Sequence, residues 1–422
     1  MIKIWFVIYN ALLLPFLWIF FHLYGIFNTK VRKGISGRRQ QIPSFTDNDK
    51  VILIHVSSLG EYQQAIPLMD EFLKLNYKIV LTFFSPSGFE NSKISNPNIF
   101  KLYLPLDSYR KVRKFIDSIN PKLLVLIRYD LWFNLLYYCK NKNIGIILAN
   151  ARFDENDKFW HFPVTSSFKK VLYGFIDKIF VIDDRDEFHY KKILKSTSAK
   201  IIKVGDSKFE RVFEASQNVS KTGLLPDKVL KDKKVFVIGS SWKQDEEVIL
   251  PAVDKILNYE KNLLIILVPH EPKETKIKMI ESNVENKYEN LKHIRYSRIE
   301  QYTNENFIIV DNIGKLMSLY SVSNISYVGG GFKSGLHNIL EPAVFHVPVI
   351  FNNRNKNSDE DELMLKYNCG IVIEDTQGCY KTLRKLLTDE NLRNQMGKNC
   401  DELFKKTLGT VKRILENLNN IK

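Results

Sequence analysis

One carboxylate stands out by its place in the first half of the chain. Glu61 follows an apolar run, Val51 to Val56, and a turn that ends at Gly60; apolar residues at helical spacing come next. A carboxylate there could act as a general base toward an acceptor hydroxyl. A favourable charge at a helix N-terminus is the plainer role, and position alone favours it. The helix dipole should also lower the pKa of Glu61 and weaken it as a base, unless burial raises that pKa.

A second stretch, whose residues could bind a ligand, runs from Tyr327 to Ala343. A short apolar strand leads into three glycines, then a loop with Lys333 and His337, then a helix that starts around Asn338. This order suits phosphate, because glycines let the backbone approach and amides at a helix start donate hydrogen bonds. It matches neither the P-loop nor the dinucleotide fingerprint. The stretch therefore predicts an anionic ligand without naming it, and an ordinary strand-to-helix turn stays equally open.

Both stretches lie in alternating patterns of apolar strand and helix. The strands expected in the first half are 51–56, 78–83, 123–127, 145–148 and 178–182. Those expected in the second half are 234–239, 263–268, 307–310, 325–328 and 347–350. Such alternation predicts an α/β protein with two doubly wound, Rossmann-like domains that face a cleft.

The expected boundaries follow from composition. They are a membrane anchor at 1–27, a basic linker at 28–45, an N-terminal Rossmann-like acceptor domain at 46–215, a C-terminal Rossmann-like donor domain at 216–405, and a C-terminal helix at 406–422. Ligands of doubly wound sheets bind outside the carboxyl ends of the strands. At that edge of the first domain we expect Ser58, Gly60, Glu61, Asp130 and Arg152.

The N-terminus is an almost wholly apolar run, from Ile4 to Phe27, followed by a basic cluster from Lys30 to Arg39. The run is long enough to cross a bilayer, and the order of its parts does not fit a secretory signal. The positive-inside rule puts the rest of the chain in the cytoplasm. A spanning anchor is favoured over a helix that lies in the interface, and a buried core helix is the weakest alternative.

The totals limit the partners. The chain has 422 residues and a formal net charge of +15, which suits an anionic membrane surface or phosphorylated substrates. No nucleic-acid-binding motif accompanies the charge, so we expect no nucleic acid partner. The four cysteines have no metal spacing and indicate reduced thiols. We expect no metal and no cofactor.

A series of short motifs runs in order from about residue 50 to residue 350. It consists of His55-Val-Ser-Ser58-Leu-Gly60-Glu61, Pro105-Leu-Asp107, Asn150-Ala-Arg152, Val204-Gly205-Asp-Ser-Lys208-Phe209, Gly239-Ser240-Ser241, Asp311-Asn312-Ile313-Gly314, and Val328-Gly329-Gly330 with His337-Asn338-Ile-Leu-Glu341-Pro342-Ala. The ordered set closely resembles the 3-deoxy-D-manno-octulosonic acid (Kdo) transferases of lipopolysaccharide biosynthesis, glycosyltransferases of the GT-B layout. Each motif is modest, but the order is specific.

The resemblance implies a reaction. Kdo would pass from CMP-Kdo to a hydroxyl of the lipid A precursor, lipid IVA, with inversion, at the cytoplasmic face of the inner membrane. Glu61 would be the general base, which reverses the weighting from position alone. The implied donor-binding residues are Ser240, Ser241, Pro269, His270, Asn312, Ile313, Gly314, Gly329, Gly330, His337, Asn338 and Glu341. The expected acceptor-binding residues are Ser58, Gly60, Arg128, Asp130, Arg152 and Lys208.

Two departures from the family pattern concern substrate contacts. Arg128 stands where the family often has a carboxylate, in E-x-E-L-W-P-N, and Pro269-His270-Glu271-Pro272 lacks the arginine of P-R-H-P. His270 or Lys273 could replace that arginine. A GT-B enzyme for another nucleotide sugar and a non-catalytic nucleotide-binding protein at the membrane surface remain as alternatives. The motifs do not count the Kdo residues transferred or define the acceptor's acylation.

Overall fold

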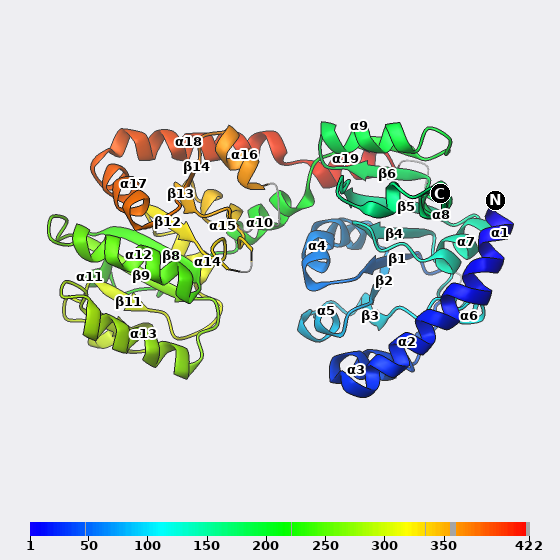
Figure 1. Cartoon of the computed structure of the whole chain (residues 1–422), viewed down its shortest axis with the longest axis horizontal. Coiled ribbons are helices and arrows are strands. Elements are labelled where there is room, and N and C mark those ends of the chain that lie inside the picture. Colours follow the sequence, from blue (N-terminus) through cyan, green and yellow to red (C-terminus); the bar gives the residue numbers. More distant parts are fainter. Residues whose placement is uncertain (47, 221, 334, 355–359, 419–422) are drawn as a thin grey trace. The chain divides into compact units, whose positions relative to one another are not determined.

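The computed structural model describes residues 1–46, 48–220, 222–333, 335–354 and 360–418. The chain forms two compact units (Figure 1). Unit 1 contains Met1–Arg211 and Thr407–Lys422, and unit 2 contains Val212–Lys406. Each unit holds one seven-stranded parallel sheet, so the prediction of two Rossmann-like domains is confirmed.

The sheet of unit 1 has the strand order β3-β2-β1-β4-β5-β6-β7. Its strands are β1 (Val51–Val56), β2 (Lys78–Phe83), β3 (Ile99–Tyr103), β4 (Leu123–Ile127), β5 (Gly145–Ala151), β6 (Lys178–Val181) and β7 (Lys200–Lys203). The sequence did not predict β3 and β7, because β3 has a lysine at its centre and β7 has one at each end. The strand order turns between β1 and β4, which is where doubly wound sheets bind ligands.

The sheet of unit 2 has the order β10-β11-β9-β8-β12-β13-β14. Its strands are β8 (Lys234–Ser241), β9 (Leu263–Pro269), β10 (His293–Arg295), β11 (Phe307–Ile309), β12 (Ile325–Val328), β13 (Val349–Phe351) and β14 (Gly370–Val372). Here β10 and β14 were not predicted, since both have only three residues and begin or end on polar residues or glycine: β10 is His293-Ile-Arg295 and β14 begins with Gly370. The corresponding turn in strand order lies between β8 and β12.

Helices connect the strands of each sheet. Those up to the end of unit 1 are α1 (Ile2–Ile8), η1 (Tyr9–Leu13), α2 (Leu14–Phe27), α3 (Thr29–Gly37), α4 (Leu59–Lys74), α5 (Pro86–Asn91), α6 (Tyr109–Ile119), α7 (Phe133–Asn141), η2 (Lys158–Trp160), α8 (Pro163–Gly174), α9 (Asp184–Ile193) and α10 (Ser207–Gln217). The later ones are α11 (Asp227–Leu230), α12 (Lys243–Ile256), α13 (Glu274–Lys287), η3 (Tyr296–Gln301), α14 (Leu316–Tyr320), α15 (Leu340–Ala343), α16 (Glu360–Lys366), α17 (Thr376–Thr388), α18 (Glu390–Thr407) and α19 (Thr410–Glu416).

The last helix returns to unit 1. The Glu210 carboxylate accepts hydrogen bonds from the backbone N–H of Gly409 and of Val411, both at 3.1 Å, and so caps α19. The Arg413 guanidinium donates to the carbonyl of Val204 at 2.7 Å. Val411 and Ile414 are buried in the core of unit 1. The C-terminal segment is therefore part of the first sheet's packing.

The N-terminal helix lies against unit 1 along one side, beside α6 and α7 (Figure 1). Tyr9 is 5% exposed, and its hydroxyl donates to Asp107 at 2.9 Å. Asn10 and Asn134 exchange side-chain hydrogen bonds of 3.1 and 2.8 Å. The stretch Ile2–Phe27, with a mean hydropathy of 2.1, is long and apolar enough to cross a membrane. The sequence favoured a spanning helix and did not predict this docked side.

Candidate functional site

Glu61 lies where unit 1 should bind a ligand, in the first turn of the helix after β1. Ser58 caps that helix, α4, because its Oγ accepts a hydrogen bond from the Glu61 N–H at 3.3 Å. The Glu61 carboxylate is 7% exposed and accepts hydrogen bonds from the Ser57 N–H at 2.6 Å and the Ser57 hydroxyl at 2.8 Å. The sheet edge thus holds a nearly buried carboxylate with a fixed orientation.

The balance of effects on Glu61 raises its pKa above the ordinary value. Burial is the largest cause, and the negative charge of Asp130 acts in the same direction. The hydrogen bonds from Ser57 and the nearby His55 oppose it. The sequence left open whether a dipole would weaken this carboxylate or burial would strengthen it as a base. Burial prevails.

A buried histidine on β1, His55, contacts residues from both sides of its strand. The Nδ1 atom of His55 lies 3.0 Å from the hydroxyl of Thr82, and its Nε2 atom lies 3.0 Å from Asp130 Oδ2. His55 is 1% exposed, whereas the side chain of Asp130 keeps 24% exposure. The structure thereby brings the predicted residues Glu61 and Asp130 into one cluster. His55 supplies a connection that was not predicted from the sequence.

Arg128 directly follows β4, and Asn150 lies near the end of the neighbouring strand, β5; both have positive φ angles, +65° and +52°. The guanidinium of Arg128 donates to Gln64 Oε1 on α4 at 3.0 Å. The Asn150 amide donates to the Ser207 hydroxyl at 2.6 Å, and that hydroxyl donates to the Gln64 carbonyl at 2.7 Å. These bonds tie the loop after β4 and the end of β5 to the helix that carries Glu61.

The other predicted acceptor residues lie on several elements of unit 1. Gly60 belongs to the first turn of α4. Lys208 stands next to Ser207, and its N–H donates to Asp206 Oδ1 at 2.8 Å. The charge of Arg152 acts on Asp186, whose pKa burial raises to about 6. Arg152 therefore belongs to the β5–α9 side of the edge, away from the His55–Asp130 pair.

In unit 2 the centre of the expected site is a carboxylate that binds the protein's own backbone. Asp245 is fully buried and accepts hydrogen bonds from the Trp242 N–H at 2.8 Å, the Tyr327 hydroxyl at 2.7 Å and the Gly330 N–H at 3.1 Å. Burial raises its pKa. Asp245 thus fixes the loop after β8 against the loop after β12, the two strands at the point where the order turns.

Rings and a cation gather above these loops. The rings of Trp242 and His270 lie 4.6 Å apart, and those of His270 and His337 are stacked at 4.4 Å. The indole N–H of Trp242 donates to His337 Nε2 at 3.1 Å. The ammonium of Lys333 lies 3.7 Å from the centre of a Trp242 ring. Two predicted donor-binding residues, His270 and His337, therefore meet in one cluster.

His337 is neutral at physiological pH in this setting. Burial, with a smaller effect of His270, lowers its pKa to about 4. Its Nε2 accepts the bond from Trp242, so its proton is on Nδ1. The charge at this place comes from Lys333, and His337 offers a hydrogen-bond donor.

The glycines after β12 are required by close packing within unit 2. A Cβ at Gly329 would lie 2.4 Å from the Ser240 carbonyl oxygen, and one at Gly330 would lie 2.2 Å from the Gly335 carbonyl oxygen. Gly330 also has a φ of +101°. The loop after β11 differs, because nothing lies within 4 Å of a Cβ at Gly314 and Ile313 is 86% exposed.

The remaining donor-side residues are already partly engaged. Ser241 donates its hydroxyl to Glu246 at 3.0 Å, while Ser240 has a φ of +53° and Pro269 ends β9. Asn338 donates to Glu341 Oε1 at 3.2 Å, at the start of α15 as predicted. Asn312 differs: its buried Oδ1 accepts no hydrogen bond within the described part of the chain. That atom is an acceptor without a hydrogen-bond donor among the described residues at this edge.

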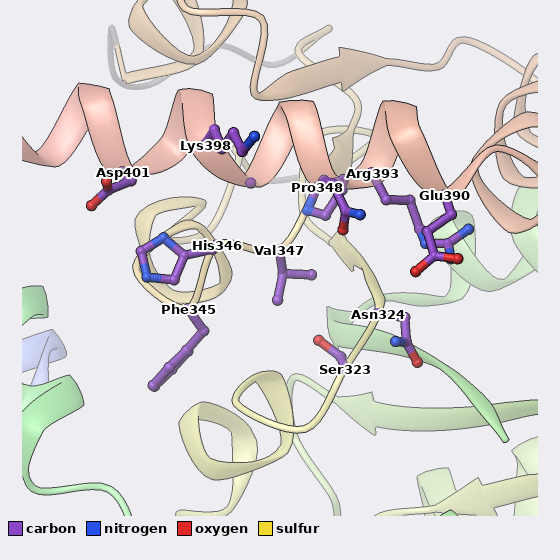
Figure 2. Close-up of a pocket in the computed structure, with 12 residues that line it drawn as sticks. Ser323, Asn324, Phe345, His346, Val347, Pro348, Glu390, Arg393, Lys398 and Asp401 are labelled. Carbon is purple, nitrogen blue, oxygen red and sulfur yellow. The ribbon is translucent and has the colours of Figure 1, made fainter. Parts of the chain in front are cut away.

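Unit 2 has a cavity of about 630 Å³ at the amino ends of its strands, opposite the edge that carries the candidate site (Figure 2). Asn324 and Pro348, which directly precede β12 and β13, line it together with residues of α18. Its polar groups stabilise the fold: Arg393 donates to the Leu386 carbonyl at 2.5 Å, and Asn324 Oδ1 accepts from the Val235 N–H at 2.7 Å. We assign this cavity no ligand.

His55, Thr82, Trp242 and Asp245 were not predicted as site residues. His55 belongs to one of the motifs, Trp242 directly follows β8, and Asp245 lies in the first turn of α12, so the positions of these three pointed to the site. What was missing is their partners, which come from other strands and loops.

Comparison with known proteins places these two edges in a family context. A profile described as 3-deoxy-D-manno-octulosonic-acid transferase (kdotransferase) matches residues 33–211. The 3-deoxy-D-manno-octulosonic acid transferase of Rickettsia prowazekii is 30% identical over 358 residues, 81% of this chain and 73% of that protein.

Two further similarities, one in sequence and one in structure, cover different shares of the other protein. A bifunctional glycosyltransferase/methyltransferase of Fusobacterium nucleatum is 30% identical over 405 residues, which are 93% of this chain and 61% of that protein; the chain therefore spans less than two thirds of it. The solved structure of UDP-GlcNAc 2-epimerase from Neisseria meningitidis matches with a TM-score of 0.58 at 13% identity, over 87% of this chain and 99% of that one. That likeness concerns the fold alone. The relatives and the ordered motifs together show that the chain belongs to the 3-deoxy-D-manno-octulosonic acid transferase family of glycosyltransferases.

Proposed function

We propose that this protein transfers Kdo from CMP-Kdo to lipid IVA, with inversion, and that Glu61 is the general base. One observation carries the proposal: a nearly buried carboxylate with a raised pKa lies at the ligand edge of unit 1, in a chain of the Kdo transferase family. A base that works near neutral pH needs such a shift, since an ordinary glutamate is a weak proton acceptor.

The proposed step balances as a single displacement. Glu61 takes the proton of an acceptor hydroxyl, and the oxygen forms a bond to the anomeric carbon of Kdo. The bond from that carbon to the phosphate oxygen breaks on the opposite face, and CMP leaves with the electron pair. Burial keeps Glu61 basic, and the negative charge of Asp130 acts in the same direction. We further propose that Ser58, Gly60, Arg128, Arg152 and Lys208 contact the acceptor.

We assign donor recognition to the edge of unit 2. In this proposal Lys333 faces the phosphate, and the neutral His337 donates from Nδ1. The open acceptor of Asn312 and the amides of the exposed loop at Gly314 would hold polar groups of CMP-Kdo. The same assignment extends to the other donor-side residues of the motifs: Ser240, Ser241, Pro269, His270, Ile313, Gly329, Gly330, Asn338 and Glu341. The step includes no metal and no cofactor.

We also propose that the protein works at the cytoplasmic face of the inner membrane. The supporting observation is the apolar helix Ile2–Phe27, whose outward residues include the exposed Phe16, Ile19 and Phe20, with the basic segment Lys30 to Arg39 after it. Exposed apolar surface beside clustered positive charge suits an anionic membrane. Lipid IVA would be reached there.

The test is a direct assay of the full chain. Incubation with CMP-Kdo and lipid IVA should add the mass of one or more Kdo residues to the lipid and release CMP. Parallel reactions with UDP-linked sugars examine the alternative donor class. Product from a UDP-sugar, with none from CMP-Kdo, would contradict the proposal.

A further inference from the structure

An apolar pocket of about 180 Å³ lies in unit 1 between the N-terminal helix and the loops at the sheet edge. Leu14, Leu17 and Phe21 form the wall on the helix side. Leu106 and Trp132 form much of the facing wall. Asp107 and Ser108 also line the pocket, but the Asp107 carboxylate already accepts hydrogen bonds from the Tyr9 hydroxyl and from the N–H groups of Asn134 and Leu135. Few polar partners remain for a bound water, so the pocket suits hydrocarbon.

The surroundings of the pocket indicate where that hydrocarbon comes from. The pocket residues 14, 17 and 21 share the docked side of the helix with Tyr9. The opposite side presents Phe16, Ile19, Phe20 and Leu23, which are between 50% and 67% exposed. A continuous apolar helix face of this kind marks an interaction surface, and at the membrane location proposed above it is covered by lipid. The pocket therefore adjoins a surface where alkyl chains are present.

The charge at the rim points to one class of lipid. Lys111 lines the pocket and belongs to the first turn of α6, on which Arg110 and, one turn later, Lys114 are also exposed. A cation beside an apolar pocket matches a lipid that joins an alkyl chain to a phosphate.

We propose that this pocket binds one acyl chain of an anionic membrane phospholipid, with its phosphate at Lys111. The bound lipid would hold the N-terminal helix against unit 1 and fix the helix's orientation at the membrane surface. The inference goes beyond the proposed transfer reaction, since it requires neither CMP-Kdo nor lipid IVA.

The test is native mass spectrometry of the full chain, titrated in detergent with phosphatidylglycerol or with phosphatidylcholine of the same chains. The unmodified chain should retain one phosphatidylglycerol. Leu17→Trp fills the pocket and should abolish this retention. Ile19→Trp places the same ring on the exposed side and should retain the lipid as the unmodified chain does.

A milder pair of variants keeps the test decisive if Leu17→Trp does not fold. Lys111→Gln should weaken phosphatidylglycerol retention about fivefold and leave phosphatidylcholine unchanged, because one cation near a lipid phosphate contributes roughly that much. Lys114→Gln is the matched control with unchanged retention. Equal retention by Leu17→Trp and the unmodified chain, or equal effects of the two lysine variants, would overturn the proposal.

Discussion

The two sheet edges hold different kinds of side chain. In unit 1 the edge carries a carboxylate of raised pKa, Glu61, next to the His55–Asp130 pair. In unit 2 the buried carboxylate, Asp245, accepts hydrogen bonds from three donors of the same unit. The other groups at that edge are aromatic rings, a lysine and the neutral His337. We therefore propose that the same sheet architecture provides acid–base chemistry in one unit and ligand recognition in the other.

The largest expected effect concerns unit 1. Glu61→Gln keeps the shape of the side chain and removes the base, so the rate of Kdo transfer should fall about 10²- to 10⁴-fold. Glu71→Gln, at an exposed carboxylate of the same helix paired with Lys74, should leave the rate unchanged. A Glu61→Gln protein with the unmodified rate would move the base elsewhere.

The next effect is on the stability of unit 2. Asp245→Ala leaves the Trp242 N–H, the Tyr327 hydroxyl and the Gly330 N–H without their acceptor. Unfolding by urea should show a loss of about 3 kcal/mol. Glu247→Ala, at an exposed neighbour on α12, should cost far less. If the two variants are equally stable, Asp245 does not organise this edge.

His337 gives a prediction with a defined direction in pH. Its folded pKa is about 4, below the ordinary value of 6.5, so the unfolded chain gains a proton first as the pH falls. Its contribution to stability is complete above pH 6.5 and is lost as the pH falls toward 4. The stability difference between pH 7.5 and pH 5 should be smaller in His337→Gln than in the unmodified chain. An equal difference in the two proteins would contradict a lowered pKa of His337 in the folded chain.

A smaller expected effect concerns the affinity for CMP, which we assign to the aromatic cluster of unit 2 and not to Glu61. Trp242→Phe keeps an aromatic ring but removes the indole N–H that holds His337. We expect CMP to bind up to about tenfold more weakly, as for the loss of one hydrogen bond. Trp160→Phe in unit 1 should bind CMP normally. Equal weakening in both variants would indicate a general loss of folding.

How much of this was predictable depends on the distance between partners in the sequence. Strand ends and helix starts follow local patterns, so Glu61 after β1 and Asn338 before α15 were placed correctly. The connection from His55 to Asp130 spans 75 residues, and Trp242 meets His337 across 95, and no local pattern records such contacts.

The N-terminal helix shows a second limit of sequence patterns. A run that is apolar on nearly all sides hides which side docks, and Tyr9 and Asn10, two of its few hydrogen-bonding residues, mark that side. Likewise, the three glycines suggested space for a ligand, whereas Gly329 and Gly330 make room for neighbouring carbonyl groups.

The most direct test of the division between the units is calorimetric titration of CMP onto the Glu61→Gln protein. If recognition belongs to unit 2 and proton transfer to unit 1, this variant should bind CMP with the affinity of the unmodified chain. A clearly weaker affinity would show that Glu61 contributes to nucleotide binding, and would contradict the assignment of the two functions to different sheet edges.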